Sequence, residues 1–438
     1  MSDSSENAKP SSIGRVVLAS FVGTMIEWYD YFLYGTAAAT VFGQLFFPSE
    51  DQFISQMSSY GAFAFGFFMR PLGGVIFGHF GDRVGRKAML VTTLLMMGLA
   101  TFLIGLLPTY ESIGVAAPIL LILLRLVQGL GVGGEWGGAV LMAVEHGHAG
   151  KRGLYGSVVQ MGVPAGLLLA TAVFSIFKLL PPEEFLSWGW RVPFLFGILL
   201  LGVGMFIRFQ VFESPLFDET KHNQGVSRLP ILEVFREYPR SVLLAMGARF
   251  AENASFYIFS VFVLSYGKTA LNIPEQTILT GIWIAAAVQI FAIPAAGILS
   301  DRFGRRPLYL AGAIGVAAFA FPFFWLLQTR VDHYIWLAIV IALIAHSLMY
   351  GPQAAFFSEL FGTRVRYSGA SVGYQLASPL AGGVAPLIAT ALLKWSDGAT
   401  WPVAAYLIAT AAITLTSIVL ATETAHSGLR DESNEQQS

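Results

Sequence analysis

Cysteine is missing from this sequence of 438 residues, and charged residues are few. Without thiols the chain can form neither disulfides nor thiolate metal sites. Charged residues account for 12% of the chain, about half of their share in an average soluble domain. With a net charge of −1 at pH 7, the chain also lacks the excess of positive charge that nucleic-acid binding requires. We therefore expect no nucleic-acid partner.

Apolar residues are abundant: 55% of the chain is hydrophobic, and the mean hydropathy is +0.64. They fall into blocks of about 20 to 27 residues, the length that crosses a hydrocarbon layer roughly 30 Å thick as a helix. Backbone groups inside a bilayer find no water, so each block must satisfy its own hydrogen bonds as an α-helix. The sequence therefore predicts an all-α integral membrane protein. We place twelve transmembrane helices at residues 16–42, 57–80, 88–107, 115–143, 154–179, 192–211, 240–267, 277–299, 307–327, 334–357, 368–392 and 400–422.

The basic residues are distributed unequally between the two sides of these spans. Of the 26 Lys and Arg residues, 18 fall on the side of the chain termini and three fall within spans. The five on the opposite side are Lys178, Arg191, Lys268, Arg330 and Lys394. Because basic loops are retained in the cytoplasm, we predict that both termini are cytoplasmic. The first apolar block is too long for the core of a signal peptide, so we expect it to remain as the first span.

An internal repeat relates the two halves of the chain. Residues 78–87 read Gly-His-Phe-Gly-Asp-Arg-Val-Gly-Arg-Lys, and residues 297–306, which lie 219 positions later, read Gly-Ile-Leu-Ser-Asp-Arg-Phe-Gly-Arg-Arg. Two further pairs recur at offsets of 214 and 215, namely Glu145 with Arg152 as Glu359 with Arg366, and Gln160 with Pro164 as Gln375 with Pro379. The chain is therefore predicted to consist of two similar halves of six helices each.

This repeat divides the chain into five segments. They are a cytoplasmic N-terminal tail (1–15), a six-helix bundle (16–211), a cytoplasmic linker (212–239), a second six-helix bundle (240–422) and a cytoplasmic C-terminal tail (423–438). In transporters built from two such repeats, the substrate binds near the bilayer midplane between halves that rock about it. The repeat thus predicts transport by alternating access.

The duplicated loop is predicted to act as a conformational latch. Gly78 and Gly297 permit close helix approach, while Asp82 and Asp301 can pair with basic groups or a neighbouring helix N-terminus in one conformation only. A loop that merely sets topology would explain the basic residues but not the repeated spacing of Gly and Asp. The other residues that we assign to the latch are Arg83, Gly85, Arg86, Arg302, Gly304, Arg305, Glu145, Arg152, Glu359 and Arg366.

The duplicated pattern Gly-x-x-x-Asp-Arg-x-Gly-Arg-Lys resembles the signature loop of the major facilitator superfamily, and the resemblance covers essentially the whole chain. Arg125-Leu-Val-Gln-Gly129 resembles a motif of the proton-linked members. Four stretches resemble the metabolite:proton symporter family: Glu-Trp-Tyr-Asp (27–30), Arg-Pro-Leu-Gly-Gly (70–74), Gly-Gly-Glu-Trp-Gly-Gly (133–138) and Glu-Ser-Pro (213–215). Residues 133–138 and 186–194 are most similar to the shikimate branch.

The resemblance implies a monomeric symporter of the bacterial inner membrane that takes up small organic acids or zwitterions together with protons. A shikimate-like substrate is expected from the branch, and no cofactor is expected. A proton-substrate antiporter is one alternative, because residues 378–383 (Ser-Pro-Leu-Ala-Gly-Gly) resemble an antiporter motif, although they lie in the eleventh span rather than the fifth. A passive facilitator is the other alternative. No constellation of residues supports enzymatic activity.

Glu27 and Asp30 lie one helical turn apart inside the first apolar block. A carboxylate near the bilayer centre costs roughly 3 kcal/mol or more, so it is usually paired, protonated or turned toward a cavity. Arg125, at a similar depth in the fourth span, is a candidate partner for Asp30. We predict that one or both acids bind the coupling proton and that Arg125 senses their charge. The alternative is a permanent Asp30–Arg125 bridge that only orients helices.

Arg249 and Glu252 occupy roughly the equivalent place in the seventh span. Arg249 would suit a substrate carboxylate, because a guanidinium fork matches its geometry. Alternatively, the two residues form a self-satisfied ion pair at spacing i, i+3. Further candidates for substrate binding are polar residues near the middle of spans: Asn253, Gln160, Gln375, Tyr374, His346 and Gln353. For Arg70 we expect a structural role, buried against Glu135.

Two tempting motifs are better explained without a ligand. Residues 129–134 (Gly-Leu-Gly-Val-Gly-Gly) contain the dinucleotide-binding pattern Gly-x-Gly-x-x-Gly, but they follow no strand and lie within an expected membrane helix. Close helix packing explains these glycines. His146 and His148 have no third ligand nearby, so we expect no metal site.

Overall fold

The computed structural model describes residues 13–209 and 230–425, which fold almost entirely as helices. The first half contains α1 with η1 and α2 (Ile13–Ala37, Ala38–Phe42 and Gly43–Phe46), α3 (Gln52–Val84), α4 (Arg86–Leu106), α6 (Ala116–His146), α7 with α8 (Arg152–Gln160 and Gly162–Lys178) and α10 (Arg191–Phe209). The second half contains α13 with η4 and α14 (Pro239–Tyr257, Ile258–Phe262 and Val263–Thr269), α15 (Glu275–Phe303), α16 (Arg305–Gln328), α17 (Asp332–Glu359), η5 with α18, η6 and α19 (Thr363–Val365, Arg366–Ala377, Ser378–Gly383 and Ala385–Trp395) and α20 (Trp401–Leu420).

Twelve helical segments coincide with the twelve predicted spans, and their ends lie within five residues of the predicted limits. Within the described ranges, eleven of them are long and apolar enough to cross a membrane by length and composition. The segment that is not among the eleven covers residues 239–269, where Arg249, Glu252 and Asn253 lie buried in α13. Polar side chains inside a span mark a functional surface more often than a structural one.

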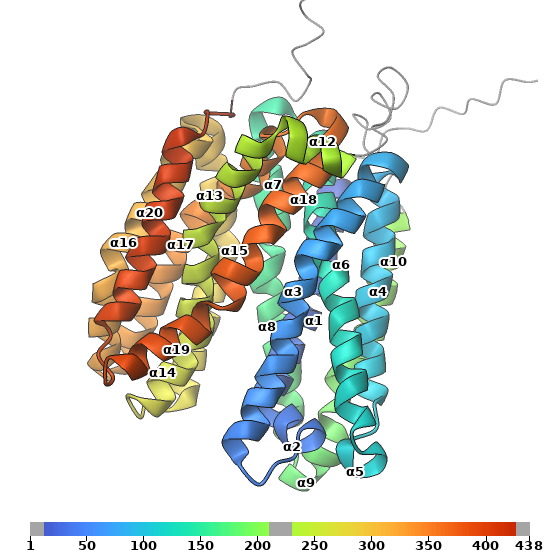
Figure 1. The fold of residues 1–438 in the computed structure, drawn as a ribbon, viewed down its shortest axis with the longest axis vertical. Helices are drawn as coiled ribbons and strands as arrows, with labels where there is room; N and C mark the ends of the chain where they lie inside the picture. The colour runs from blue at the N-terminus through green and yellow to red at the C-terminus, as the bar shows by residue number, and fades with distance from the viewer. Residues whose placement is uncertain (1–12, 210–229, 426–438) are drawn as a thin grey trace, which may run out of the picture.

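The two halves form two helical bundles that lie side by side (Figure 1). Between them, α3 packs against α18, while α7 packs against α15 and α17. In Figure 1 the ribbons of the two bundles converge at the top, where α12 (Pro230–Glu237) lies, and diverge at the bottom. We call the converging end the terminal end, because the last turn of α20 lies there beside the start of α13, with Arg240 donating a hydrogen bond to the carbonyl of Leu420 (3.1 Å).

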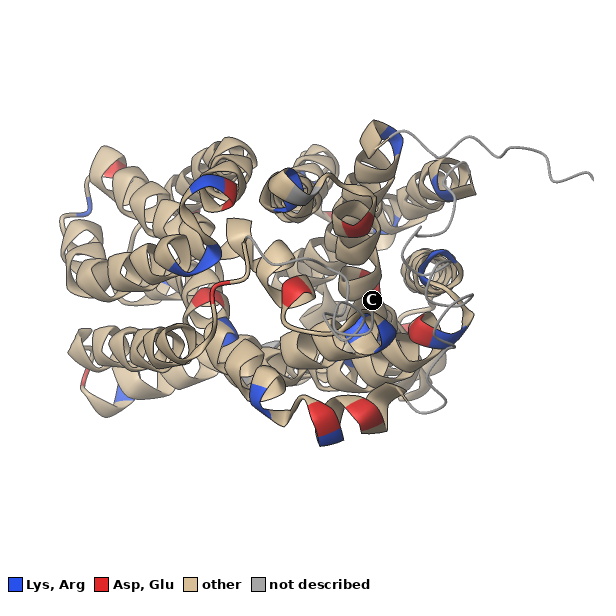
Figure 2. Cartoon of the chain, turned by 90° about the horizontal axis from the view of Figure 1, so that it is seen from above, with Lys and Arg blue, Asp and Glu red and all other residues tan. Residues whose placement is uncertain are grey.

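The duplicated loops both open onto the terminal end. Figure 2 looks down on this end and shows acidic and basic positions on helices of both bundles. Each loop turns on one glycine, Gly85 between α3 and α4 and Gly304 between α15 and α16. Their φ angles are +127° and +102°, in the region that residues with a side chain avoid. This sharp turn requires a glycine at the same place in both repeats.

The glycine-rich run 129–134 lies inside α6, where this helix packs against α3. A Cβ atom added at Gly129 would collide with the backbone carbonyl of Gly66, and one at Gly133 would collide with that of Arg70. The interpretation of this run as a close packing surface is confirmed, because the backbones approach too closely for any side chain.

Some predicted features lie wholly or partly outside the described residues. The Glu-Ser-Pro stretch at 213–215 is one of them, as are most of the two tails and the first part of the linker. Where the description resumes, residues 230–237 of the predicted linker form α12. At the start of the chain, α1 begins at Ile13, three residues before the predicted span.

Candidate functional site

The aspartates of the two duplicated loops bridge the halves at the terminal end. Asp82, in the last turn of α3, accepts hydrogen bonds from the backbone N–H groups of Tyr367 (3.2 Å) and Ser368 (2.8 Å) in the first turn of α18. Asp301, in the last turn of α15, accepts two such bonds of 2.8 and 2.9 Å from the first turn of α7. A carboxylate at this place satisfies N–H groups that have no partner within the helix, and it interacts favourably with the helix dipole.

A buried ionic cluster lies beside the first of these contacts. Glu145 of α6 binds Arg86 at the start of α4 (3.1 Å) and Arg366 at the start of α18 (3.3 Å). Glu145 thus joins a cation of its own half to a cation of the other half. All three side chains are almost completely buried, so removing one of them would leave an uncompensated charge away from water.

The second cluster repeats the first with the halves exchanged. Glu359 of α17 binds Arg305 at the start of α16 (3.1 Å) and Arg152 at the start of α7 (3.6 Å). Arg305 also binds Asp301, at 2.7 Å. The structure therefore brings the pairs that the sequence repeat singled out into two equivalent contacts between the halves.

The two glycines of the repeat lie where these helices touch. A Cβ atom added at Gly78 would lie 2.9 Å from the Cα atom of Ser368, and one added at Gly297 would collide with the backbone of Gly153. Any side chain at either position would push the two halves apart. The close approach that we expected for these glycines thus occurs between the bundles.

Arg83 and Arg302 take no part in the contacts between the halves that the structure describes. Both are exposed on the outer side of their helices. The described contact of Arg83 is with His79 on its own helix (3.4 Å), and Arg302 lies over the ring of Phe303 (5.3 Å). Since each follows the bridging aspartate by one position, the helix turns its side chain away from the opposite half.

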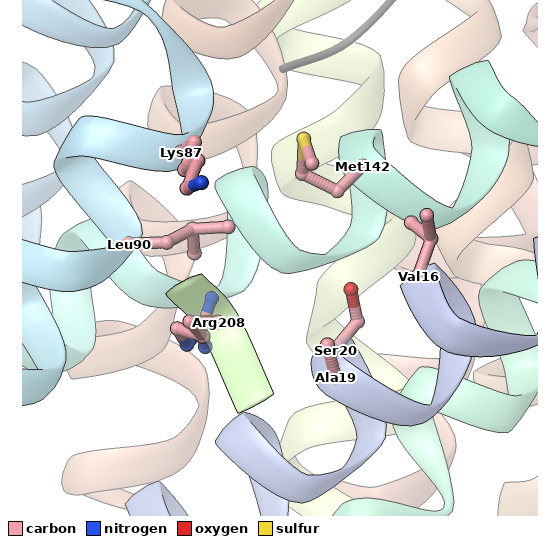
Figure 3. A pocket seen from close by; sticks show the side chains of 7 residues that line it. All are labelled: Val16, Ala19, Ser20, Lys87, Leu90, Met142 and Arg208. Carbon is pink, nitrogen blue, oxygen red and sulfur yellow. The ribbon is translucent and has the colours of Figure 1, made fainter. Parts of the chain in front are cut away.

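A small pocket lies inside the first half near the terminal end (Figure 3). Its polar lining consists of Ser20 of α1, Lys87 of α4 and Arg208 of α10, and apolar side chains complete it. Its free space corresponds to about one water molecule. Every lining residue belongs to the first half.

A second small pocket lies between the halves and is lined by side chains from both. Trp28 of the first half and Tyr374 of the second are among them, together with Arg249, Glu252 and His346. Its free space also corresponds to about one water molecule. A metabolite would therefore enter it only if the two halves moved apart.

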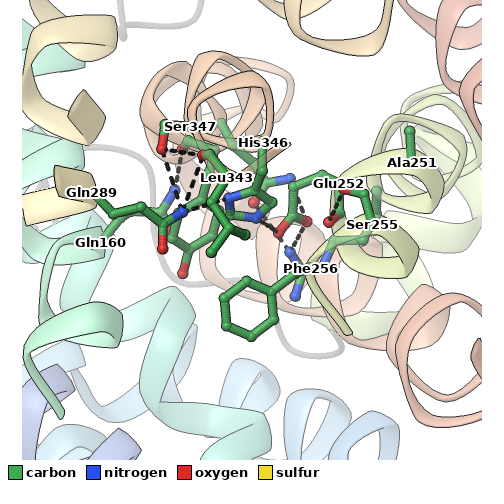
Figure 4. Close-up of polar contacts among 12 residues, drawn as sticks. Gln160, Ala251, Glu252, Ser255, Phe256, Gln289, Leu343, His346 and Ser347 are labelled. Carbon is green, nitrogen blue, oxygen red and sulfur yellow. Dashed lines mark hydrogen bonds and ion pairs between the residues drawn. The ribbon is translucent and has the colours of Figure 1, made fainter. Parts of the chain in front are cut away.

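A polar network in this second pocket is centred on Glu252. Glu252 forms an ion pair with Arg249, which lies one turn before it, so the self-satisfied pair considered from the sequence is present. Gln353 of α17 bridges the two, with its oxygen accepting from Arg249 (3.2 Å) and its nitrogen donating to Glu252 (3.2 Å). The remaining oxygen of Glu252 lies 3.0 Å from Nε2 of His346 (Figure 4).

The surroundings of His346 assign its hydrogen. The side-chain nitrogen of Gln289 lies within 3.3 Å of the carbonyl of Leu343 and 3.1 Å from Nδ1 of His346 (Figure 4). Because the carbonyl can only accept, this nitrogen is the donor, and Nδ1 accepts. Nε2 then carries a hydrogen, which His346 donates to Glu252.

Tyr374 and Asn253 each present a polar atom that lacks a hydrogen bond of ordinary length to the residues that the structure describes. The ring of Tyr374 stacks on Trp136 with 3.6 Å between centroids and lies 3.3 Å from the guanidinium carbon of Arg249. The hydroxyl of Tyr374 and the side-chain nitrogen of Asn253 have no hydrogen-bond partner among the described residues. Both residues line the second pocket, where a ligand could supply the missing bonds.

Three glutamines that we expected at the cavity do not line the pocket. Gln160 accepts a hydrogen bond from Trp136 (2.8 Å) and donates one to the backbone of α17. Gln375 donates to the carbonyl of Val132 in α6 (3.3 Å), and Gln353 lies behind the ion pair that it bridges. Their amides connect helices, because satisfying a buried amide takes partners that neighbouring helices already offer.

Glu27 and Asp30 are both buried in α1, with 2% and 1% of their surfaces exposed. Oε2 of Glu27 and both carboxylate oxygens of Asp30 have no hydrogen-bond partner in the described part of the chain. The expected pairing of Asp30 with Arg125 is wrong, since no ion pair between them occurs there. Arg125 instead binds Gln128 (3.2 Å) and lies over the ring of Tyr34 (4.4 Å).

The expected contact of Arg70 with Glu135 is also wrong. Arg70 lies over the rings of Tyr31 and Phe67, at 4.5 Å from each, and Glu135 pairs with Arg208 in the last turn of α10. Sequence reasoning missed Arg208 because it counted this residue with the basic residues that set topology. Its position inside an apolar block could have identified it, since a buried cation needs a partner.

Comparison with known proteins gives consistent matches. Residues 20–373 match the family model of the Major Facilitator Superfamily. The chain is 43% identical over 399 residues to the shikimate transporter of Escherichia coli (strain K12), covering 90% of this chain and 91% of that protein. It is 40% identical over 426 residues to the inner membrane metabolite transport protein YhjE of the same strain, covering 96% of each. In fold it matches the MFS proton:xylose symporter XylE bound to 6-bromo-6-deoxy-D-glucose, with a TM-score of 0.77 and 17% identity over 96% of this chain and 98% of that one.

Proposed function

The chain belongs to the Major Facilitator Superfamily, and we propose that it is a symporter that carries a small, shikimate-like organic acid into the cell together with protons. It is a multi-pass membrane protein, and its basic terminal end faces the cytoplasm of a bacterial inner membrane. One chain holds both halves, both latch contacts and the pocket between them, so the working unit is a monomer. Transport needs no cofactor.

Two buried carboxylates, Glu27 and Asp30, support proton coupling more than any other observation. An ionised carboxylate without a donor inside a membrane costs roughly 3 kcal/mol or more. In the arrangement that the structure describes, neither oxygen of Asp30 accepts a hydrogen bond from a described residue, and a bound proton removes that cost. A rearrangement that turned a cation of the first half toward Asp30 would favour its ionised form and release the proton.

The pocket between the halves suits a small hydroxylated carboxylic acid. Arg249 supplies a guanidinium for the carboxylate, and the unused polar atoms of Asn253 and Tyr374 supply hydrogen bonds for hydroxyl groups. Trp28 offers an aromatic wall for the ring. The identity of 43% with a shikimate transporter supports this substrate class.

The two contacts at the terminal end describe one state of the transport cycle. They hold the halves together on the side that faces the cytoplasm, through Asp82 and Asp301. Substrate and proton then enter from the opposite side. Rocking of the halves breaks both contacts and releases the load into the cytoplasm.

Uptake of radiolabelled shikimate into vesicles that contain the purified protein tests this function. An inward proton gradient should drive accumulation, a protonophore should abolish it, and unlabelled α-ketoglutarate, citrate, proline and betaine should compete poorly. Glu27→Gln and Asp30→Asn should each reduce accumulation at least tenfold, because an amide cannot carry the proton. Glu111→Gln, in the exposed helix α5 (Tyr110–Ile113), is the matched control and should behave like the wild type.

Each of the other outcomes identifies a different function. Uptake that is only downhill and ignores the protonophore would establish a passive facilitator. Shikimate driven outward by the proton gradient would establish an antiporter. Effective competition by one of the other solutes would keep the symporter but replace its substrate. Normal accumulation in both acid variants would refute the coupling role of Glu27 and Asp30.

A further inference from the structure

A balanced set of buried charges lies inside the first half, away from the latch contacts. The described residues place three acids there, Glu27, Asp30 and Glu135, and three arginines, Arg70, Arg125 and Arg208. Proton coupling as proposed above uses Glu27 and Asp30 but gives no role to Glu135 and Arg208. Buried ionisable groups in a membrane protein are candidates for a proton path.

We propose that protons leave the first half toward the terminal end through Glu135 and the pocket of Figure 3, with Arg208 as the gate, on a route separate from the substrate path. This inference rests on the proposed function, because it needs protons to move with the substrate. It adds Glu135 and Arg208 to the residues that handle the proton.

One face of α1 connects the coupling acids to this pocket. Val16, Ser20, Gly23, Glu27 and Asp30 follow one another at spacings of three or four, so they form a single stripe along the helix. Val16 and Ser20 line the pocket, and Glu27 and Asp30 are the acids at the other end of the stripe. The stripe therefore spans the distance that a proton must travel within the first half.

Gly23 is the point where this stripe meets Glu135 and Arg208. A Cβ atom added at Gly23 would lie 3.1 Å from Oε1 of Glu135 and would collide with the guanidinium of Arg208. Only a glycine leaves room for this ion pair beside α1. Glu27 lies one turn further along, and the charges that act on it include those of Glu135 and Arg208. Its Oε2 has no hydrogen-bond partner among the described residues, so it is free to donate a proton to a neighbouring acceptor.

The contacts of Glu135 allow its carboxylate to accept the proton of Glu27 only when Arg208 releases the carboxylate. Thr93 of α4 donates a hydrogen bond to its Oε2 (2.6 Å), and Arg208 pairs with its Oε1. While Arg208 occupies Oε1 and Thr93 occupies Oε2, neither oxygen of Glu135 is open to a proton donor. Arg208 also lines the pocket, so the ion pair lies beside the space through which the proton leaves. The step moves one proton from the carboxylic acid of Glu27 to the carboxylate of Glu135, and then through water in the pocket to the cytoplasm.

The pocket can hold the water molecule that this step requires. Ser20, Lys87 and Arg208 offer three polar side chains around a space of about one water molecule, and a buried water ordinarily has about three partners. The pocket of Figure 3 and the second pocket, which lies between the halves, have no lining residue in common. The proton exit is thus distinct from the path of the substrate.

A short chain of contacts links this gate to the latch. Lys87, next to the latch residue Arg86, donates a hydrogen bond to the backbone carbonyl of Phe209 (3.3 Å), next to Arg208. Opening the latch shifts the first turn of α4, and through Lys87 it shifts the last turn of α10. The gate therefore opens with the cytoplasmic side, so that protons do not leak while the latch is closed.

Two assays separate the route from transport itself. Exchange of labelled for unlabelled shikimate at equal pH on both sides needs the halves to rock but needs no net proton release. Net uptake driven by a proton gradient needs both. The double variant Glu135→Gln/Arg208→Gln removes both charges together, so neither residue is left as a buried charge without its partner. We expect exchange within about twofold of the wild type and net uptake at least tenfold slower, because a glutamine pair cannot relay a proton.

A milder pair of variants covers the case in which the double variant does not fold. Thr93→Val removes the hydrogen bond to Glu135, whereas Thr92→Val changes its exposed neighbour, which bonds only within its own helix (2.9 Å to the carbonyl of Ala88). Only Thr93→Val should slow net uptake relative to exchange. Equal loss of exchange and net uptake in the Glu135 and Thr93 variants would assign them a structural role and overturn the route. Variants in which both rates equal those of the wild type would overturn the route as well. If the wild type itself shows no proton-driven uptake, the proposed function is refuted instead.

Discussion

Replacement of Asp82 and Asp301 by asparagine should open the terminal end of the transporter. Each aspartate accepts two backbone hydrogen bonds from the first turn of a helix in the other half. Asparagine keeps one acceptor oxygen but presents an NH2 group to the second N–H, so one charge-assisted bond is lost. Such a bond contributes about 1.5–3 kcal/mol, which changes the ratio of closed to open molecules by about 10-fold to 150-fold.

The absence of cysteine makes this change straightforward to measure. Spin labels on Val84→Cys and Phe303→Cys, at the exposed ends of α3 and α15, report the distance between the halves in protein reconstituted into lipid nanodiscs. Pulsed electron resonance should show a longer distance in Asp82→Asn and in Asp301→Asn. The double variant should shift further, because the two contacts lie on different helix pairs and their effects add.

Asp397→Asn is the matched control, since Asp397 lies in the exposed turn between α19 and α20 at the opposite end. It should leave the distance distribution unchanged. If the double variant also keeps the distribution of the parent protein while it still binds substrate, then the aspartates do not hold the halves together. The same helix contacts would then have to be maintained by the packing of α3 on α18 and of α7 on α15 alone.

Two further predictions concern the pocket and the C-terminal end of α20. Tyr374→Phe should raise the KM for uptake about tenfold with little change in the maximal rate. The variant removes a hydroxyl that has no partner among the described residues and is therefore available to bind the substrate. Initial rates over a range of substrate concentrations check this. Burial raises the pKa of Glu423, but backbone N–H groups, including those of Arg305 and Arg306, outweigh it and hold the pKa below its ordinary value of 4.5. The ionised Glu423 thus caps the start of α16, which stabilises the fold above pH 4.5, and this contribution is lost as the pH falls through the lowered pKa. Hydrogen exchange at the backbone N–H groups of Arg305 and Arg306 should show the loss as falling protection. Glu423→Gln should lower that protection already at neutral pH.

The sequence by itself determined the helical framework. Twelve apolar blocks and a repeat at offsets near 215 predicted the spans and their grouping, because hydropathy and periodicity are properties of contiguous segments. The same repeat singled out Asp82 with Asp301 and Glu145 with Glu359, and the structure places both pairs in equivalent contacts between the halves. A glycine in each loop could be recognised from its spacing, although only the φ angles explain why it is needed.

Only the tertiary structure decided which buried charges meet. From the sequence, Asp30 and Arg125 lie at similar depths, yet Arg125 turns toward aromatic rings, and Glu135 takes Arg208 rather than Arg70 as its partner. Depth along a span follows from counting residues, but the direction of a side chain follows from the rotation of each helix about its axis. That rotation is set by packing against helices that are distant in sequence, such as the glycine contacts of α6 with α3.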